Sequence, residues 1–96
     1  MIKGITPQEE QIIKQILSKY PYEFYYYGSR VKGDYTKSSD LDILLKSSKS
    51  VDYIIPASIE REFNESKIPY IVNISEYDKM DKDFYKLIEK DLVKVL

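Results

Sequence analysis

The sequence contains no cysteine and no histidine among its 96 residues. Without cysteine, the chain forms no disulfide, holds no zinc through thiolates and has no thiol nucleophile. Without histidine, imidazole is excluded both as a general base and as a metal ligand. Any proton transfer must therefore use a carboxylate, a lysine, a tyrosine or water.

The sequence also lacks a long hydrophobic run and a strong excess of either charge. No apolar stretch approaches the length that spans a membrane, and residues 1–5 show neither a long apolar segment nor a cleavage site. The formal net charge of −1 argues against tight, nonspecific binding of nucleic acid through a broad basic face. We therefore expect a cytoplasmic protein without membrane contact and without a strong nucleic-acid signal.

The length and the composition are those of one globular domain. The 96 residues are 43% hydrophobic and 32% charged, which allows a single modest core over residues 1–96. A separate domain for substrate recognition does not fit in this length. A large substrate must therefore be recognised together with a partner chain or a second copy of this one.

Hydrophobic spacing predicts alternating helices and strands. Thr6, Pro7 and Glu9 form a helix start, in which Thr6 caps the helix and Glu9 lies three residues after it. Alternation predicts that Val72 and Ile74 share one face of a strand and Asn73 the other. The predicted helices cover residues 6–19, a segment opened by Pro56, and 83–96; the predicted strands cover 22–27, 41–46 and 68–75.

The most informative stretch covers residues 28–42 and lies between two predicted strands. It begins Gly-Ser-Arg-Val-Lys-Gly and ends Ser-Asp-Leu-Asp. Because Gly28 directly follows a strand, the backbone can turn sharply and the next amides can point at an anion. Ser29 then opens a predicted short helix, which places its hydroxyl and the helix N-terminus on a phosphate.

Basic side chains gather around this predicted phosphate site. Arg30 lies within the turn and is the strongest candidate for a nucleotide contact. Lys32, Lys37 and Lys46 are the other basic residues nearby, and ordinary solvated side chains are the alternative interpretation for all four.

Asp40 and Asp42 lie two residues apart at the start of the second predicted strand, so both carboxylates project from the same face, roughly 7 Å apart. Two like charges this close need a cation, or one of them must stay protonated. Mg²⁺ suits the pair, because it binds one or two carboxylates and completes its shell with water and phosphate. A turn that can bind phosphate, beside a carboxylate pair that can bind a metal ion, indicates nucleotide chemistry.

Two other nucleotide-binding patterns do not fit this stretch. A Walker A loop needs Gly-Lys followed by Ser or Thr, whereas Gly33 is followed by Asp34 and Tyr35. The dinucleotide-binding pattern Gly-x-Gly-x-x-Gly does not occur. The structural alternative is a plain glycine turn followed by a solvated acidic strand edge.

The pattern Gly-Ser, three residues, Gly, five residues, Ser-Asp-x-Asp resembles the minimal nucleotidyltransferase family of the DNA polymerase beta superfamily. Gly28, Ser29, Gly33 and Ser39 meet its fixed positions, together with Asp40 and Asp42. The resemblance covers nearly the whole chain. It implies an α/β (α+β) nucleotidyltransferase fold, a small mixed sheet of three to four strands with helices packed on it.

The resemblance also implies roles for individual residues. In the family the serine binds triphosphate and the aspartates hold divalent metals, so Ser29 is expected to bind triphosphate, and Asp40 and Asp42 to bind Mg²⁺ as a one- or two-metal site. The family's third carboxylate aligns with Asn73, which is the main departure from the pattern. An amide oxygen can ligate a metal but accepts no proton, so Glu76 or Asp78 would have to replace a missing general base.

Two functions follow. The first is Mg²⁺-dependent transfer of a nucleoside monophosphate, AMP from ATP, to a hydroxyl of a protein or small acceptor. The alternative is a catalytically weakened nucleotide- or partner-binding module, favoured by Asn73. The resemblance implies for it an antitoxin-type role beside a helical partner of the HEPN (higher eukaryote and prokaryote nucleotide-binding) type. A homo-oligomer is a further arrangement that the sequence leaves open.

Overall fold

The computed structural model of the chain describes residues 2 and 4–96, and a four-stranded sheet with the order β3-β2-β1-β4 forms its centre. β2 pairs antiparallel with β1 and parallel with β3, and β4 pairs antiparallel with β1. The sheet is therefore mixed, which confirms the predicted fold class. The strands are β1 (Glu23–Tyr27), β2 (Leu41–Lys46), β3 (Val72–Glu76) and β4 (Val93–Lys94).

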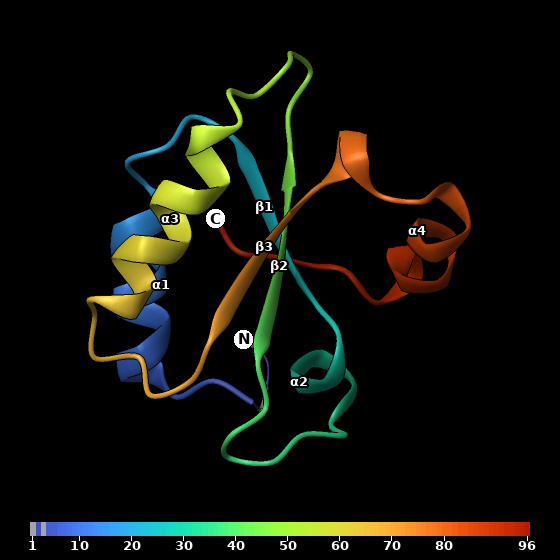
Figure 1. Cartoon of the computed structure of the whole chain (residues 1–96). Coiled ribbons are helices and arrows are strands. Elements are labelled where there is room, and N and C mark those ends of the chain that lie inside the picture. The colour runs from blue at the N-terminus through green and yellow to red at the C-terminus, as the bar shows by residue number, and fades with distance from the viewer. Residues whose placement is uncertain (1, 3) are drawn as a thin grey trace.

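Helices cover both faces of the sheet. α1 and α3 lie together on one face, while α2 and α4 lie on the other (Figure 1). We call the second one the α4 face; it carries Tyr25, Tyr27, Asp42, Leu44, Asn73 and Ser75. The helices are α1 (Pro7–Leu17), α2 (Ser29–Lys32), α3 (Ile54–Asn64) and α4 (Lys82–Ile88), with 3-10 turns η1 (Tyr77–Lys79) and η2 (Glu89–Asp91).

The start of α1 confirms the predicted capping box. The Thr6 hydroxyl accepts a hydrogen bond from the Glu9 amide, and the Glu9 carboxylate accepts one from the Thr6 amide, both at 3.1 Å. These bonds satisfy two amides that the first helical turn leaves unpaired. The helix ends at Leu17, two residues before the predicted end at Lys19.

Strand alternation produces two hydrophobic clusters. The larger lies between the sheet and the α1–α3 pair, where Phe24, Ile43 and Leu45 from the sheet meet Leu17 and Phe63 from the helices. The smaller lies on the α4 face, where Tyr27 and Leu44 contact Ile88 of α4. Because neighbouring side chains point to opposite faces, β1 and β2 supply residues to both clusters.

α3 makes the predicted crossover between the parallel strands β2 and β3. It begins at Ile54, two residues before Pro56, which therefore lies inside the first turn, where proline is tolerated. β3 is the outermost strand on its side, and its Ile74 amide donates a 2.8 Å hydrogen bond to the Glu60 carboxylate of α3. The helix thus covers a backbone donor that an edge strand exposes.

Two predicted segments differ from the structure. β3 begins at Val72 rather than at residue 68, in agreement with the inability of Pro69 to donate a ladder hydrogen bond. The single helix predicted over residues 83–96 is wrong, because α4 ends at Ile88 and β4 follows. Pairing of β4, extended by a 2.9 Å bond from the Val95 amide to the Phe24 carbonyl, satisfies the outer edge of β1.

None of the helices in the described part of the chain has the length and apolar character needed to cross a membrane.

Candidate functional site

Asp40, Asp42 and Asn73 meet at one end of the α4 face. The Asn73 amide nitrogen donates to Asp40 at 3.1 Å and to Asp42 at 3.4 Å. The parallel pairing of β2 with β3 sets Asn73 directly beside Asp42. The amide therefore bridges two carboxylates that would otherwise repel each other.

Gly28 closes this site from the side of β1. A Cβ atom on Gly28 would lie 2.5 Å from a carboxylate oxygen of Asp42, and the residue has a φ of +89°. Both facts exclude other residues, because L side chains rarely adopt this φ and the added atom would overlap the carboxylate. The predicted glycine turn therefore brings the chain against the aspartate pair.

The environment of Asp42 favours its neutral form. Burial raises the pKa of Asp42 above its usual value, the hydrogen bond from Asn73 opposes that rise, and the negative charge of Asp40 adds to it. A bound cation would offset both the burial and the repulsion. Holding the two charged carboxylates together in this partly buried site therefore costs free energy, and a bound cation would offset that cost.

The donor set fits a magnesium ion. Asp40, Asp42 and Asn73 offer carboxylate and amide oxygens at one place, and Mg²⁺ prefers oxygen ligands with several positions left for water and phosphate. Asn73 would first have to turn its amide so that the oxygen faces the cation. Within residues 2 and 4–96, no group of three or more Asp, Glu, His or Cys side chains could hold a metal.

The predicted phosphate-binding turn forms a single helical turn, α2. Gly28 caps its start, Ser29 is its first residue, and Gly33 ends it in the left-handed conformation with a φ of +90°. The Gly33 and Asp34 amides donate to the Ser29 carbonyl at 2.9 and 3.1 Å. These bonds hold Ser29 directly after β1, beside the aspartate end of the sheet.

Ser39 shapes the loop that leads to Asp40. Its hydroxyl accepts a 2.8 Å hydrogen bond from the Thr36 amide, which closes a short turn before β2. Its carbonyl accepts a 3.0 Å bond from the Arg30 guanidinium. Ser39 therefore positions Asp40 through the backbone; its direct contact with nucleotide stays a prediction.

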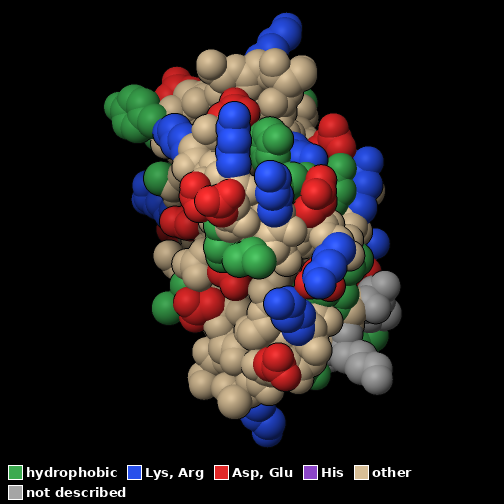
Figure 2. Space-filling model, turned by 90° about the vertical axis from the view of Figure 1, so that its right-hand side faces the viewer, with side chains coloured by type: hydrophobic (Ala, Val, Ile, Leu, Met, Phe, Trp, Pro, Cys, Tyr) green, Lys and Arg blue, Asp and Glu red, His purple; other side chains and the backbone are tan. Residues whose placement is uncertain are grey.

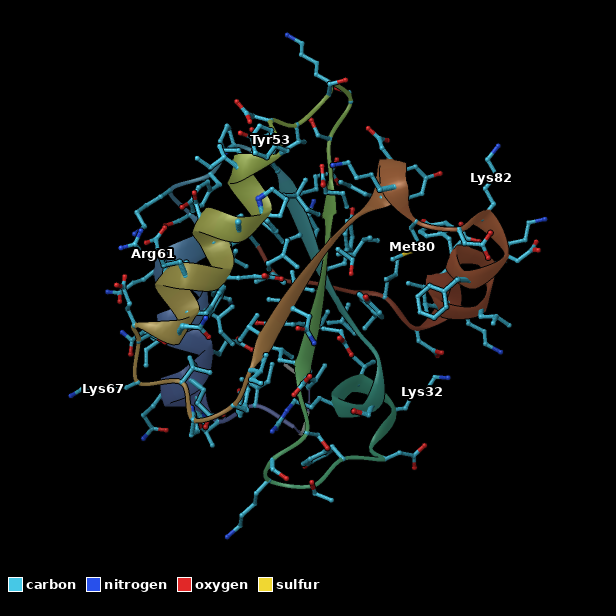
Figure 3. The ribbon with its side chains drawn as sticks, viewed as in Figure 1. Lys32, Tyr53, Arg61, Lys67, Met80 and Lys82 are labelled. Carbon is cyan, nitrogen blue, oxygen red and sulfur yellow. The ribbon has the colours of Figure 1, made fainter. Side chains whose placement is uncertain are left out.

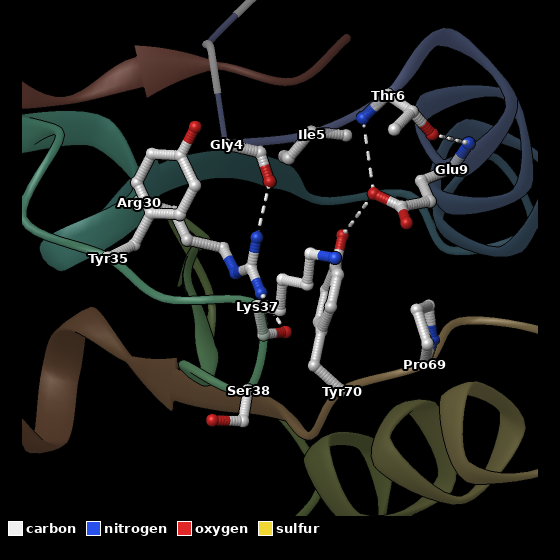
Figure 4. Close-up of a pocket in the computed structure, with 10 residues that line it drawn as sticks. All are labelled: Gly4, Ile5, Thr6, Glu9, Arg30, Tyr35, Lys37, Ser38, Pro69 and Tyr70. Atoms are coloured by element: carbon white, nitrogen blue, oxygen red, sulfur yellow. Dashed lines mark hydrogen bonds between the residues drawn. The ribbon is translucent and has the colours of Figure 1, made fainter.

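Arg30 is buried, with only 4% of its surface exposed. Its guanidinium donates to the carbonyls of Gly4, Thr36, Lys37 and Ser39 and lies 3.8 Å from the centre of the Tyr70 ring (Figure 4). It thus joins the segment before α1 to the loop before β2. The predicted nucleotide contact of Arg30 stays a prediction, and the structure adds a positioning role that the sequence did not indicate.

Lys37 lines the same cavity as Arg30 and its backbone carbonyl accepts a 3.1 Å bond from that guanidinium, whereas the Lys32 and Lys46 ammonium groups have other partners. Lys46 lies four residues after Asp42 on β2, about 13 Å along the strand, with its ammonium 2.8 Å from the Tyr85 hydroxyl. Lys32 pairs with Asp91 of η2 at 3.9 Å. The interpretation that Lys46 gathers at the phosphate site is therefore wrong, since strand length separates it from the turn.

Tyr27 and Ser75 also belong to this end of the α4 face, and sequence reasoning did not single out Ser75. Tyr27 lies opposite Asp42 in the β1–β2 pairing, and its hydroxyl is 3.0 Å from that of Ser75. Burial raises the pKa of Tyr27, so this hydroxyl stays protonated. The alternation of side chains along a strand could have indicated Ser75, because it follows Asn73 by two residues and residues two apart share a face.

Glu76 and Asp78 lie away from the aspartates. Glu76 is three residues after Asn73, roughly 10 Å along β3, and its carboxylate pairs with Lys79 at 3.1 Å. Asp78 is exposed in η1. Their proposed replacement of the missing carboxylate has no contact in the structure to support it.

A mixed sheet that brings a glycine–serine turn beside an aspartate pair defines the class of protein as a nucleotidyltransferase domain. The model of the family described as "Nucleotidyltransferase domain" matches residues 9–95, and the chain belongs to this family. The chain is a nucleotidyltransferase. The assignment to the minimal nucleotidyltransferase family, made from the sequence motif, is confirmed.

Two known proteins are similar to the chain. The chain is 33% identical over 88 residues to a protein of Haemophilus influenzae named "Probable protein adenylyltransferase MntA", covering 90% of this chain and 77% of that one. The solved structure "Crystal structure of the toxin-antitoxin with AMP-PNP" has a chain with the same fold. That match has a TM-score of 0.75 and 16% identity and covers 91% of this chain and 72% of the other.

Proposed function

We propose that the protein transfers AMP from ATP to a hydroxyl group of a protein partner in a Mg²⁺-dependent reaction. The single observation that carries this proposal is the meeting of Asp40, Asp42 and Asn73 beside the turn at Gly28. The relative from Haemophilus influenzae, which is named a protein adenylyltransferase, supports the choice of donor and of acceptor.

Each residue of the site has a role in this proposal. Ser29 and the backbone amides of its turn hold the triphosphate, and Gly28 lets the turn approach Asp42. Asp40, Asp42 and the Asn73 oxygen would hold the Mg²⁺ ion, which would neutralise negative charge on the triphosphate. These residues align the acceptor hydroxyl with the α-phosphorus by holding the nucleotide in one orientation.

The reaction joins the acceptor oxygen to the α-phosphorus and breaks the bond to the β-phosphate, so pyrophosphate leaves. The hydroxyl proton goes to a carboxylate, a lysine, a tyrosine or water, because the chain has no histidine and no cysteine. Asn73 accepts no proton, so general-base assistance at its position is absent. This loss is worth roughly a hundred- to ten-thousand-fold in rate.

A second candidate function is a nucleotide- or partner-binding module with little catalysis, and Asn73 is the observation that favours it. In this alternative the protein silences a helical HEPN-type toxin by binding it. The solved toxin–antitoxin structure with the same fold supports testing such a partner. The two functions differ in whether silencing needs the aspartates.

The test is a labelling reaction with labelled ATP, Mg²⁺ and a candidate helical HEPN-type partner protein. We expect label on the partner with wild-type protein and with Asp83→Ala, which removes an exposed aspartate of α4. Asp42→Ala should abolish labelling. Equal labelling by Asp42→Ala would refute the enzymatic role, while a stable, silencing complex formed by that variant would establish the binding module.

A further inference from the structure

The α4 face contains a cavity next to the aspartate site. The cavity has a volume of about 440 Å³ and is bounded by β3, η1 and α4. Tyr27 and Ser75 of the sheet line it, together with Met80 and with Phe84 of α4. This volume is within the range of small-ligand pockets.

The position of the cavity matches the geometry of a nucleotide at the proposed site. Tyr27 lies opposite Asp42 in the sheet, so their Cβ atoms are about 5 Å apart. Ser75 follows Asn73 by two residues on the same face, roughly 7 Å along β3. A ribose separates a base from its α-phosphate by a comparable distance. A triphosphate on the α2 turn would therefore direct its base into this cavity.

The walls of the cavity offer an aromatic surface. The Phe84 ring meets the Tyr27 ring edge to face, with centroids 6.2 Å apart and planes at 76°. Phe84 is 42% exposed although it is a large apolar side chain, and Met80 lies between the sheet and α4 (Figure 3). Bases stack well on such rings. On this side of the molecule, hydrophobic side chains reach the surface among mixed charges (Figure 2).

The polar groups of the cavity are mainly acceptors. The Glu76 side chain is only 11% exposed, and its ion pair with the exposed Lys79 uses one carboxylate oxygen at 3.1 Å. Asp81 brings a second carboxylate, which accepts a 3.3 Å bond from the Phe84 amide. Carboxylates accept hydrogen bonds from an exocyclic amino group and disfavour a carbonyl oxygen at that position. Adenine is therefore the purine that suits the cavity, because its 6-position carries an amino group.

We propose that this cavity binds the adenine base of the donor nucleotide, with Phe84 as its stacking surface and Glu76 as the acceptor for its amino group. This inference rests on the proposed function and adds the residues that choose the base. Two further cavities in the described part of the chain suit the base less well, because neither is lined by a residue of the α4 face next to Asp42.

Calorimetry with two ligands tests the inference separately from the proposed function. The ligands are α,β-methylene ATP, which cannot release pyrophosphate, and inorganic tripolyphosphate, which has no base, both with Mg²⁺. Phe84→Leu keeps an apolar side chain but removes the ring, and should weaken the nucleotide analogue about tenfold while leaving tripolyphosphate unchanged. Leu87→Ala, which alters an exposed residue of the same helix outside the cavity, should change neither affinity.

The amino group is tested by competition. ATP should displace the analogue from wild-type protein at lower concentration than ITP, which has a carbonyl oxygen at the 6-position, and Glu76→Gln should remove most of this difference. Unchanged analogue affinity in Phe84→Leu, with Ser29→Ala weakening both ligands, would refute the base site and leave the proposed function standing. Wild-type protein that binds neither ligand would refute both.

Discussion

Replacing Arg30 with methionine should destabilise the protein severely, because its guanidinium is buried and holds two distant segments together. The side chain is 4% exposed and donates to four backbone carbonyls, including those of Gly4 and Ser39. Methionine has similar length but offers none of these donors. The substitution therefore leaves the carbonyls to find water or stay unpaired.

The magnitude follows from the number of bonds and their surroundings. Hydrogen bonds from a charged group are worth about 1.5–3 kcal/mol each. The full sum is not lost, since methionine needs no desolvation of a charge and the loop carbonyls of Thr36 and Lys37 can rehydrate. We expect a net loss of about 3–5 kcal/mol, as for other broken buried charge networks. A domain of 96 residues has roughly 5–14 kcal/mol in all.

Urea unfolding followed by far-UV circular dichroism measures this loss, and Tm should fall by at least about 12 °C. Arg61→Met is the matched control, because the Arg61 side chain is 80% exposed and should change stability by no more than about 0.5 kcal/mol. A loss below about 1 kcal/mol in Arg30→Met would refute the assigned role. Arg30→Lys should recover little, because one ammonium cannot reach four carbonyls.

Three further predictions concern the aspartate site. Gly28→Ala should cost roughly 1–3 kcal/mol more in urea unfolding than Gly33→Ala, because both have positive φ but only Gly28 meets Asp42; equal losses would contradict the close approach. Asn73→Asp should tighten Mg²⁺ binding in calorimetry by about tenfold or more, since an added charge near the cation is worth about 4 kcal/mol before repulsion is subtracted; no gain would mean that Asn73 does not face the metal. Asp42→Asn should raise the Tm of the protein in EDTA. Because the folded pKa of Asp42 is raised, the wild type loses stability as pH rises through that value, and the advantage of the variant should grow in the same window. A constant difference across pH would reject this reasoning.

Local patterns predicted the elements that frame the site. The capping box at Thr6 and Glu9 fixed the start of α1, and β2 has the bounds that apolar alternation indicated. The family resemblance aligned Asn73 with the third carboxylate, and the parallel pairing of β3 with β2 sets Asn73 beside Asp42 on one face of the sheet. These signals act over short distances or follow from chain topology.

The failures have long-range causes. The spacing of Leu92 and Val95 suits a helix as well as a strand, and the structure has a strand there, where it satisfies the open edge of β1. The positioning role of Arg30 was also missed, while its predicted nucleotide contact stays a prediction. Its hydrogen-bond partners are backbone carbonyls, one of them 26 positions away. Every residue has a backbone carbonyl, so the residue types in a sequence do not reveal such a partner.

The contact between Glu60 and the Ile74 amide has a consequence for self-association. An uncovered outer strand is a template on which a second copy can extend the sheet, and such growth leads toward fibrils. Here the carboxylate blocks the middle of that strand, and a charged group must be displaced before another backbone can pair with it. Intermolecular contacts of this protein should therefore form through side chains, and Glu60→Ala should make it prone to aggregate.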